Sequence, residues 1–244
     1  MSDHVAHEAA GACLQQGFEL HQAGRLTDAE PYCRAALERR PDFPATWSNL
    51  GLVRMAAGAV DEAEQCQREA LRLDPVFADA HNGLGLVHYR FGRVAEAENC
   101  FRGCLRLWPD HPGAHLNLAV ALQSRGRMEE AEVWYRDALC VGANAAEVYN
   151  NLSVLLRELG RVAEAQASCR EALHLRPEMA GAQVNLAISL LLTGRWAEAS
   201  AILILIFLSV AGLCHLFGGT MGGVRAGQRS RRYWWRLGEG ESEQ

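Results

Sequence analysis

Apolar and small residues recur along this chain with the spacing of an amphipathic helix. In the segment 45–57, the positions i, i+3, i+4 and i+7 share one helix face, and they hold Trp47, Leu50, Gly51 and the stem of Arg54. Gly58 follows directly. Glycine often ends a helix because it adopts the left-handed conformation at little cost. The pattern therefore predicts a helix that ends at Gly58.

The same pattern returns at a fixed interval along the chain. The glycine recurs as Gly24, Gly58, Gly92, Gly126, Gly160 and Gly194. A small residue recurs as Ala29, Ala63, Ala97, Ala131, Ala165 and Ala199, each preceded by an acidic residue. Six copies without an insertion indicate an internal repeat, and they span 10–43, 44–77, 78–111, 112–145, 146–179 and 180–213.

Each copy is predicted to form two helices. The acidic residue before the alanine suits the first turn of the second helix, where the helix dipole favours negative charge. The alanine lets the two helices approach closely. Proline then closes the second helix because it lacks the N–H and clashes with the preceding turn, at Pro41, Pro75, Pro109 and Pro177. Copy four departs, since Gly142, Ala143 and Asn144 replace the proline.

These residues resemble the tetratricopeptide repeat. Copy two carries the family pattern as Trp47-x-x-Leu50-Gly51, Ala63, Ala70 and Pro75, and copy three as Leu84-Gly85, Ala97, Phe101 and Pro109. The resemblance implies an all-α fold, an α-solenoid of six 34-residue helix-turn-helix repeats in a right-handed superhelix, with first helices lining a concave groove. The solenoid is expected over 10–200, after an N-terminal extension at 1–9, with its last repeat atypical.

Composition argues against several classes of function. The chain has 24 basic and 29 acidic residues, a formal charge of −5, so no nucleic-acid partner is expected. It lacks a phosphate-binding loop, a G-x-S-x-G motif and an H-E-x-x-H motif. We therefore expect no enzyme, no cofactor and no small-molecule substrate.

The cysteines and the N-terminus favour the cytoplasm. The eight cysteines include no C-x-x-C pair, so we interpret them as small apolar residues in a reducing compartment. The first 30 residues lack the basic start and apolar run of a cleaved secretory signal. His81 and His115 share one repeat position; we interpret them as replacements for an aromatic packing residue, and expect no metal site.

A row of amides is the strongest candidate binding site. It holds Asn49, Asn82, Asn117, Asn151 and Asn185, with Gln15 in copy one. Because an amide offers donors and an acceptor in one plane, such a row could hold a peptide backbone without reading its side chains. The row resembles that of O-linked N-acetylglucosamine transferases and their bacterial relatives. The alternative is that these amides only tie the helices together.

A second binding mode of this repeat class, the carboxylate clamp, is excluded by the sequence. One of its asparagine positions lies three residues after the row, where this chain has Leu52, Leu86, Val120, Val154 and Ile188. Aliphatic side chains cannot hydrogen-bond a carboxylate.

The C-terminal part abandons the repeat pattern. Residues 201–224 form a charge-free, largely apolar segment, and 225–244 are rich in Arg and Trp and then acidic, a composition for which we expect disorder. Three alternatives stay open for the segment: a membrane contact through 201–236, a buried cap or dimer contact, or an altered reading of a longer gene. A single span would be short.

Together these features predict a non-enzymatic scaffold that binds protein or peptide segments in the groove. The first alternative is the detached substrate-recruiting region of a protein O-glycosyltransferase. The second is a membrane-attached assembly factor. We expect the protein in the cytoplasm, with membrane association through the C-terminal segment as the alternative.

Overall fold

The computed structural model describes the chain except for residues 1–10, 13–14, 18, 21–24 and 211–244. The expected N-terminal extension and the 225–244 tail thus lie outside the described residues. The part that is described contains helices and no strand. It divides into two compact units, residues 1–144 and 145–244, and each unit is treated by itself below.

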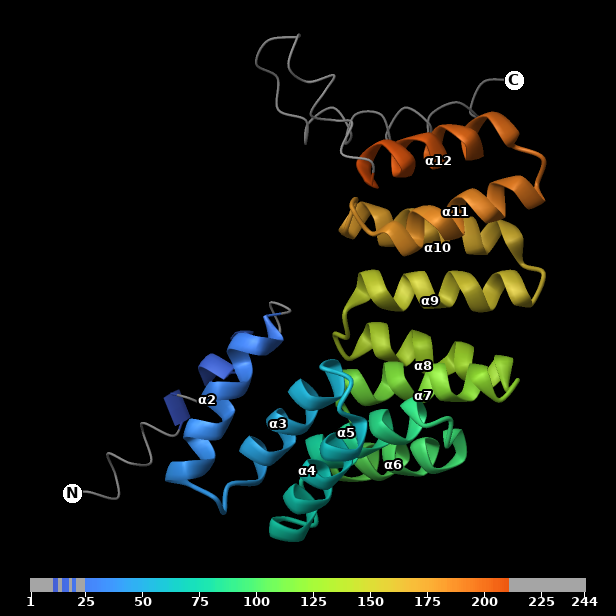
Figure 1. The fold of residues 1–244 in the computed structure, drawn as a ribbon. Helices are drawn as coiled ribbons and strands as arrows, with labels where there is room; N and C mark the ends of the chain where they lie inside the picture. Colours follow the sequence, from blue (N-terminus) through green and yellow to red (C-terminus); the bar gives the residue numbers. More distant parts are fainter. Residues whose placement is uncertain (1–10, 13–14, 18, 21–24, 211–244) are drawn as a thin grey trace, which may run out of the picture. The chain divides into compact units, whose positions relative to one another are not determined.

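Helices alternate with short turns throughout both units. The first unit contains α2 (Leu26–Arg39), α3 (Pro44–Ala56), α4 (Val60–Leu73), α5 (Ala78–Arg90), α6 (Val94–Leu107), α7 (Pro112–Ser124) and α8 (Met128–Cys140). The second contains α9 (Ala145–Glu158), α10 (Val162–Leu175), α11 (Ala180–Leu192) and α12 (Trp196–Val210). Within each unit every helix packs against the next one along the chain (Figure 1), which confirms an α-solenoid of helix-turn-helix repeats.

The predicted turn glycines form the turn inside each repeat. Their φ angles lie between 74° and 84° at Gly58, Gly92, Gly126, Gly160 and Gly194. Other residues adopt this left-handed conformation only at a cost. Gly142 has a φ of 80° and follows α8 where the other copies use proline. The second helix of copy four is therefore followed by a glycine in the left-handed conformation, as the first helices are.

Small residues set the distance between paired helices. Every repeat alanine is fully buried, with 0% exposure at Ala29, Ala63, Ala97, Ala131, Ala165 and Ala199. A Cβ atom built on Gly85 of α5 would lie 2.5 Å from Cε1 of Phe101 on α6. Paired helices are therefore too close for a larger residue at these positions.

A recurring hydrogen bond joins four of the first helices to the end of the preceding repeat. Four side chains of three kinds, Trp, His and Gln, contact the carbonyl of the proline that lies six positions earlier. The pairs are Trp47 with Pro41 at 2.8 Å, His81 with Pro75 at 3.0 Å, His115 with Pro109 at 2.7 Å, and Gln183 with Pro177 at 2.8 Å. The two histidines thus stand in the place of the tryptophan, as expected.

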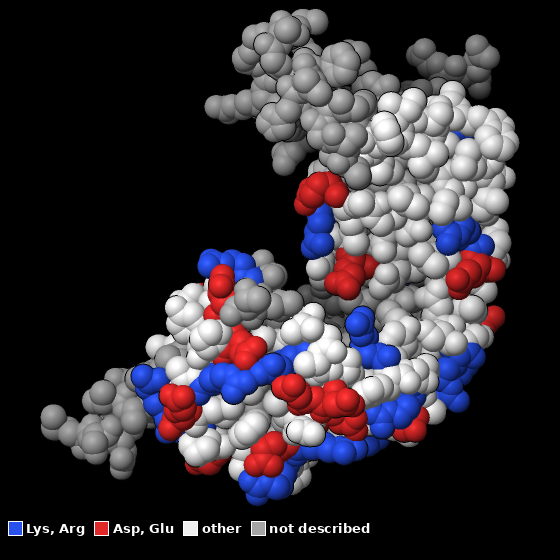
Figure 2. All heavy atoms as spheres, in the orientation of Figure 1, with Lys and Arg blue, Asp and Glu red and all other residues white. Residues whose placement is uncertain are grey.

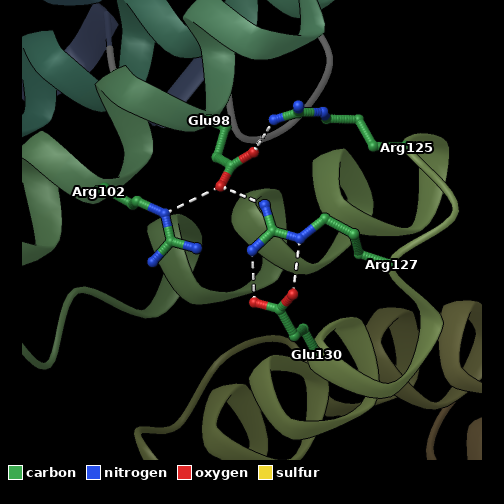
Figure 3. A network of polar contacts seen from close by, with 5 residues as sticks. All are labelled: Glu98, Arg102, Arg125, Arg127 and Glu130. Atoms are coloured by element: carbon green, nitrogen blue, oxygen red, sulfur yellow. Dashed lines mark hydrogen bonds and ion pairs between the residues drawn. The ribbon is translucent and has the colours of Figure 1, made fainter.

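Buried glutamates hold successive second helices of the first unit together. The carboxylate of Glu98 on α6, with only 7% of its side chain exposed, accepts from Arg102 at 3.0 Å and from Arg127 at 2.8 Å, and it also contacts Arg125 (Figure 3). Arg127 in turn pairs with Glu130 at 2.5 Å. The network therefore extends from α6 to the start of α8.

The same arrangement recurs one repeat earlier. Glu64 pairs with Arg68 at 2.6 Å and with Arg93 at 2.8 Å.

Burial alone would raise the pKa of Glu98, but the hydrogen bonds from its arginines outweigh burial and lower the pKa below the usual value. The ionised form of Glu98 therefore stabilises the fold.

The close helix contact leads to a first prediction. Replacing Ala97 by Leu should overpack the α5–α6 contact and lower the free energy of unfolding by about 1–3 kcal/mol. The matched control is Ala95→Leu on the exposed face of the same helix, which should change stability little. Urea unfolding followed by circular dichroism measures both, and equal stability of the two variants would contradict the packing described.

The buried carboxylate leads to a second prediction. Glu98→Gln should lower the free energy of unfolding by about 1–3 kcal/mol at pH 7, because charge-assisted hydrogen bonds are lost. The pKa of Glu98 is lowered by folding, so its contribution is present above the unfolded value of about 4.3 and is lost as the pH falls through the folded value. Urea unfolding at pH 7 and pH 3 should show the gap between wild type and variant closing in acid. A gap that persists at pH 3, or one equally large for the exposed Glu171→Gln, would refute this account.

Candidate functional site

Amide side chains form a bridge between neighbouring first helices in the first unit. Nδ2 of Asn117 on α7 donates to Oδ1 of Asn82 on α5, over 2.9 Å. The hydroxyls of Tyr89 and Ser124 form a second bridge between the same helices, at 2.8 Å. All four side chains lie at the surface or partly buried. We call the surface that these bridges cross the first-helix face.

The second unit repeats the amide bridge between α9 and α11. Nδ2 of Asn185 donates to Oδ1 of Asn150 over 2.9 Å. Asn150 also donates to Asn151 at 3.3 Å, and Nη1 of Arg157 donates to Oδ1 of Asn185 at 3.4 Å. The two bridges are equivalent, because Asn150 lies two repeats after Asn82 and Asn185 lies two repeats after Asn117.

The structure thus places the predicted amides in three ways. Asn82, Asn117 and Asn185 belong to bridges, Asn151 accepts from its neighbour, and Asn49 lies partly exposed on α3. Asn150 was missed by the sequence analysis, although its spacing of two repeats from Asn82 was a usable signal. Whether any of these amides binds a ligand stays a prediction.

Copy three lacks an amide in the regular row for a steric reason. Gln67 of α4 inserts between α3 and α5, where its Nε2 donates to the backbone oxygen of Ser48 at 2.9 Å. A Cβ atom on Gly83 would lie 2.5 Å from Cδ and Nε2 of Gln67. A side chain at position 83 would therefore have to displace the buried Gln67. The bridging amide of this copy, Asn82, lies one position earlier, at the register of Asn150 in copy five.

Aliphatic side chains flank the amides. Leu52, Leu86, Val120 and Val154 are half-buried, and Ile188 is 38% exposed. In the first unit the first-helix face therefore combines neutral amides with aliphatic groups, and α9 and α11 of the second unit combine the same kinds of residue. Such a surface can hydrogen-bond a peptide backbone and cover apolar side chains, but it supplies few fixed charges.

Two thiols in the core of the described repeats are buried and poorly activated. Burial raises the pKa of Cys33 to about 11 and that of Cys104 to about 12, so both thiols are protonated at neutral pH. Burial likewise lowers the pKa of His88. His111 uses Nδ1 to cap α7, accepting from the backbone N–H of Ala114 at 3.0 Å.

Neither a metal cluster nor a spanning helix is found in the described part of the chain. No three His, Cys, Asp or Glu side chains among the described residues lie close enough together to hold a metal ion. Among the helices that the structure describes, none is both long enough and apolar enough to cross a membrane.

Two protein families match this chain. The sequence profile of the family described as the cilia and flagella-associated protein 70 C-terminal domain matches residues 4–187, and that of a tetratricopeptide repeat matches residues 180–203. The comparison with curated proteins finds no match. The finer likeness to the superhelix of O-linked N-acetylglucosamine transferases therefore stays a prediction.

Solved structures of similar fold come from several sources. TTC0263, a thermophilic TPR protein of Thermus thermophilus, is 23% identical, with a TM-score of 0.67 over 75% of this chain and 100% of that chain. PilF of Pseudomonas aeruginosa is 20% identical, with a TM-score of 0.67 over 88% and 95%. A chain of the APC/C hetero-tetramer Cut9-Hcn1 is 20% identical, with a TM-score of 0.71 over 80% and 40%. At these identities the likeness establishes the fold alone.

The steric account of copy three can be tested directly. Gly83→Asn should destabilise the protein by about 1–3 kcal/mol through overpacking against Gln67. In a Gln67→Ala background the same change should cost much less, because the obstructing side chain is gone. A double-mutant cycle measured by urea unfolding checks this, and additive effects of the two changes would show that Gln67 is not the obstacle.

Proposed function

This chain belongs to the tetratricopeptide-repeat family described as the cilia and flagella-associated protein 70 C-terminal domain, and we propose that it is a non-enzymatic scaffold that holds an extended protein segment along its first-helix face. Repeats of this kind commonly serve as surfaces for protein partners. The finer statement, that the segment is held by its backbone, rests on the amide bridges of this chain.

The Asn82–Asn117 bridge is the observation that carries the proposal. It uses one N–H of Asn117 and the carbonyl of Asn82. Each asparagine has two N–H donors and one carbonyl acceptor, so the carbonyl of Asn117 and the N–H groups of Asn82 stay available to a ligand. A donor and an acceptor held side by side match the C=O and N–H of a peptide unit. The bridge thus fixes the amides in place and still supports backbone binding.

The flanking groups support an extended ligand of mixed composition. Leu86 on α5 and Val120 on α7 lie beside the bridge positions and are half-buried. They can cover apolar side chains of many shapes, because aliphatic contacts are not directional. Backbone recognition with tolerant side-chain contacts is expected to accept unrelated sequences.

A second candidate function follows from the same amides. If their likeness to the transferase superhelix holds, this chain recruits substrates for a protein O-glycosyltransferase. A membrane-attached assembly factor is a third candidate, supported by the apolar α12. A cytoplasmic location is part of this proposal. The thiols of Cys33, Cys66, Cys104 and Cys169 are buried and free, which is compatible with a reducing compartment.

The amides can be tested as a group. In the variant Asn82→Ala, Asn117→Ala, Asn150→Ala, Asn185→Ala, binding to an array of unrelated unstructured peptides should fall across the array. Each lost hydrogen bond contributes about 0.5–1.5 kcal/mol. Peptide arrays and fluorescence titration measure the loss, and far-UV circular dichroism checks that the helices remain.

The matched control is Asn99→Ala, an exposed asparagine of α6, which should leave binding unchanged. Loss of a single peptide only would indicate side-chain recognition. Unchanged binding with a lowered melting temperature would assign the amides a purely structural role.

A further inference from the structure

One position of the second helix is covered in the earlier repeats and uncovered in the last one. At this register, which recurs once in every repeat, the residues are at most 1% exposed: Cys33, Gln67, Phe101, Tyr135 and Cys169. In copy six the position holds Leu203, which is 44% exposed. Leu203 therefore lacks a neighbour that its counterparts have.

The missing neighbour is a following first helix. Gln67 shows the geometry, because its side chain reaches both Gly51 of its own first helix and Gly83 of the next one. Leu203 has α11 on one side, and within the described chain nothing stands in the place of α5. The position four residues later shows the same difference in exposure. Leu173 is 6% exposed beneath α11, whereas its counterpart Phe207 is 67% exposed.

The neighbouring surface of α11 is apolar too. Val184 is 39% exposed and Ile188 is 38% exposed. Their counterparts on α9 are Asn150 and Val154, and α11 packs against both α9 and α10. By the same register, Val184, Ile188, Leu203 and Phe207 mark the place where a further helix would lie. We call these four residues the end face.

A second surface of α12 is also apolar. A further first helix stacked on the end face would leave this second surface exposed to water. The outer positions of the second helices of the first unit hold arginines paired with glutamates, as in Arg68–Glu64 and Arg102–Glu98. In α12 the arginine position holds Ile204, and the glutamate position holds Ser200. Ile204 is 57% exposed and its neighbour Leu205 is 43% exposed.

Charge is absent from this part of the second unit. After Glu198, α12 contains no charged residue, and Glu198 is paired with Arg195 at 2.6 Å. Figure 2 shows a mainly uncharged surface over the helices of this unit. Large exposed apolar patches mark interaction sites, and an uncharged one can meet its own copy without like-charge repulsion.

We propose that the end face is the interface of a homodimer, in which α12 of a second copy lies across Leu203 and Phe207 in the place of a further first helix. A helix that covers the end face also lies next to Ile204 and Leu205, which border this face. The helix must therefore be apolar on more than one side. Among the described helices α12 itself has this character. A twofold arrangement then covers both copies of α12 with one contact, as in other isologous dimers.

The mass of the full chain in solution tests the proposal. Sedimentation equilibrium of the wild type should give twice the 26.8 kDa chain mass. The double variant Leu203→Asp, Phe207→Asp should be monomeric at the same concentration. The matched control Val76→Asp, at a 65% exposed apolar residue of the first unit, should remain dimeric.

A second variant guards against misfolding of the first. Ile204→Arg with Leu205→Glu installs the residues found at the same register in α10, Arg170 and Glu171. These residues are compatible with the repeat, and at the rim they should raise the dimer dissociation constant at least tenfold without loss of helical circular dichroism.

Three outcomes would overturn the proposal. A monomeric wild type that associates only after deletion of 211–244 would show that the chain covers its own end face. A monomeric wild type that sediments with phosphatidylglycerol vesicles would assign the face to lipid. A dimer that persists in both α12 variants would place the interface elsewhere.

Discussion

The close approach of paired helices at a buried small residue is the contact on which the rest of this structure depends. The alanine in the first turn of each second helix is fully enclosed, and Gly51 and Gly85 face side chains that leave no space for a Cβ atom. Because the contact returns once in every repeat, side chains at equivalent places meet from one repeat to the next. The amide bridges and the glutamate–arginine networks therefore both recur with the spacing of the repeat.

The two kinds of polar contact connect different helices of the repeats. Glutamates buried between second helices hold several arginines each, and Glu98 alone joins three. Neutral amides connect first helices instead. Gln166 replaces the glutamate in copy five, where its Nε2 donates to the backbone oxygen of Ser189 at 3.0 Å. The row of buried glutamates therefore stops before copy five.

Local features were predictable from the sequence because their causes are local. Glycine adopts the turn conformation, proline stops a helix, and alanine permits close packing whatever the distant surroundings, so the helix-turn-helix repeat was identified correctly. The exception in copy four was also visible, since Gly142 replaces the proline. The amide row was only partly predictable. Its pairing depends on which side chains meet across two helices. The period points to Asn150 through Asn82, but the obstruction of Gly83 by Gln67 does not follow from the period alone.

The cationic half of the glutamate network consists of guanidinium groups only, because all 24 basic residues of the chain are arginine. Guanidinium stays charged at any pH that a folded protein tolerates, and its planar fork suits a carboxylate at two points. Alkaline conditions therefore leave the network charged. No side chain carries a primary amine, so acetylation, ubiquitination and amine-directed cross-linkers have no lysine to modify. The contacts between repeats are thus insensitive to a whole class of covalent regulation.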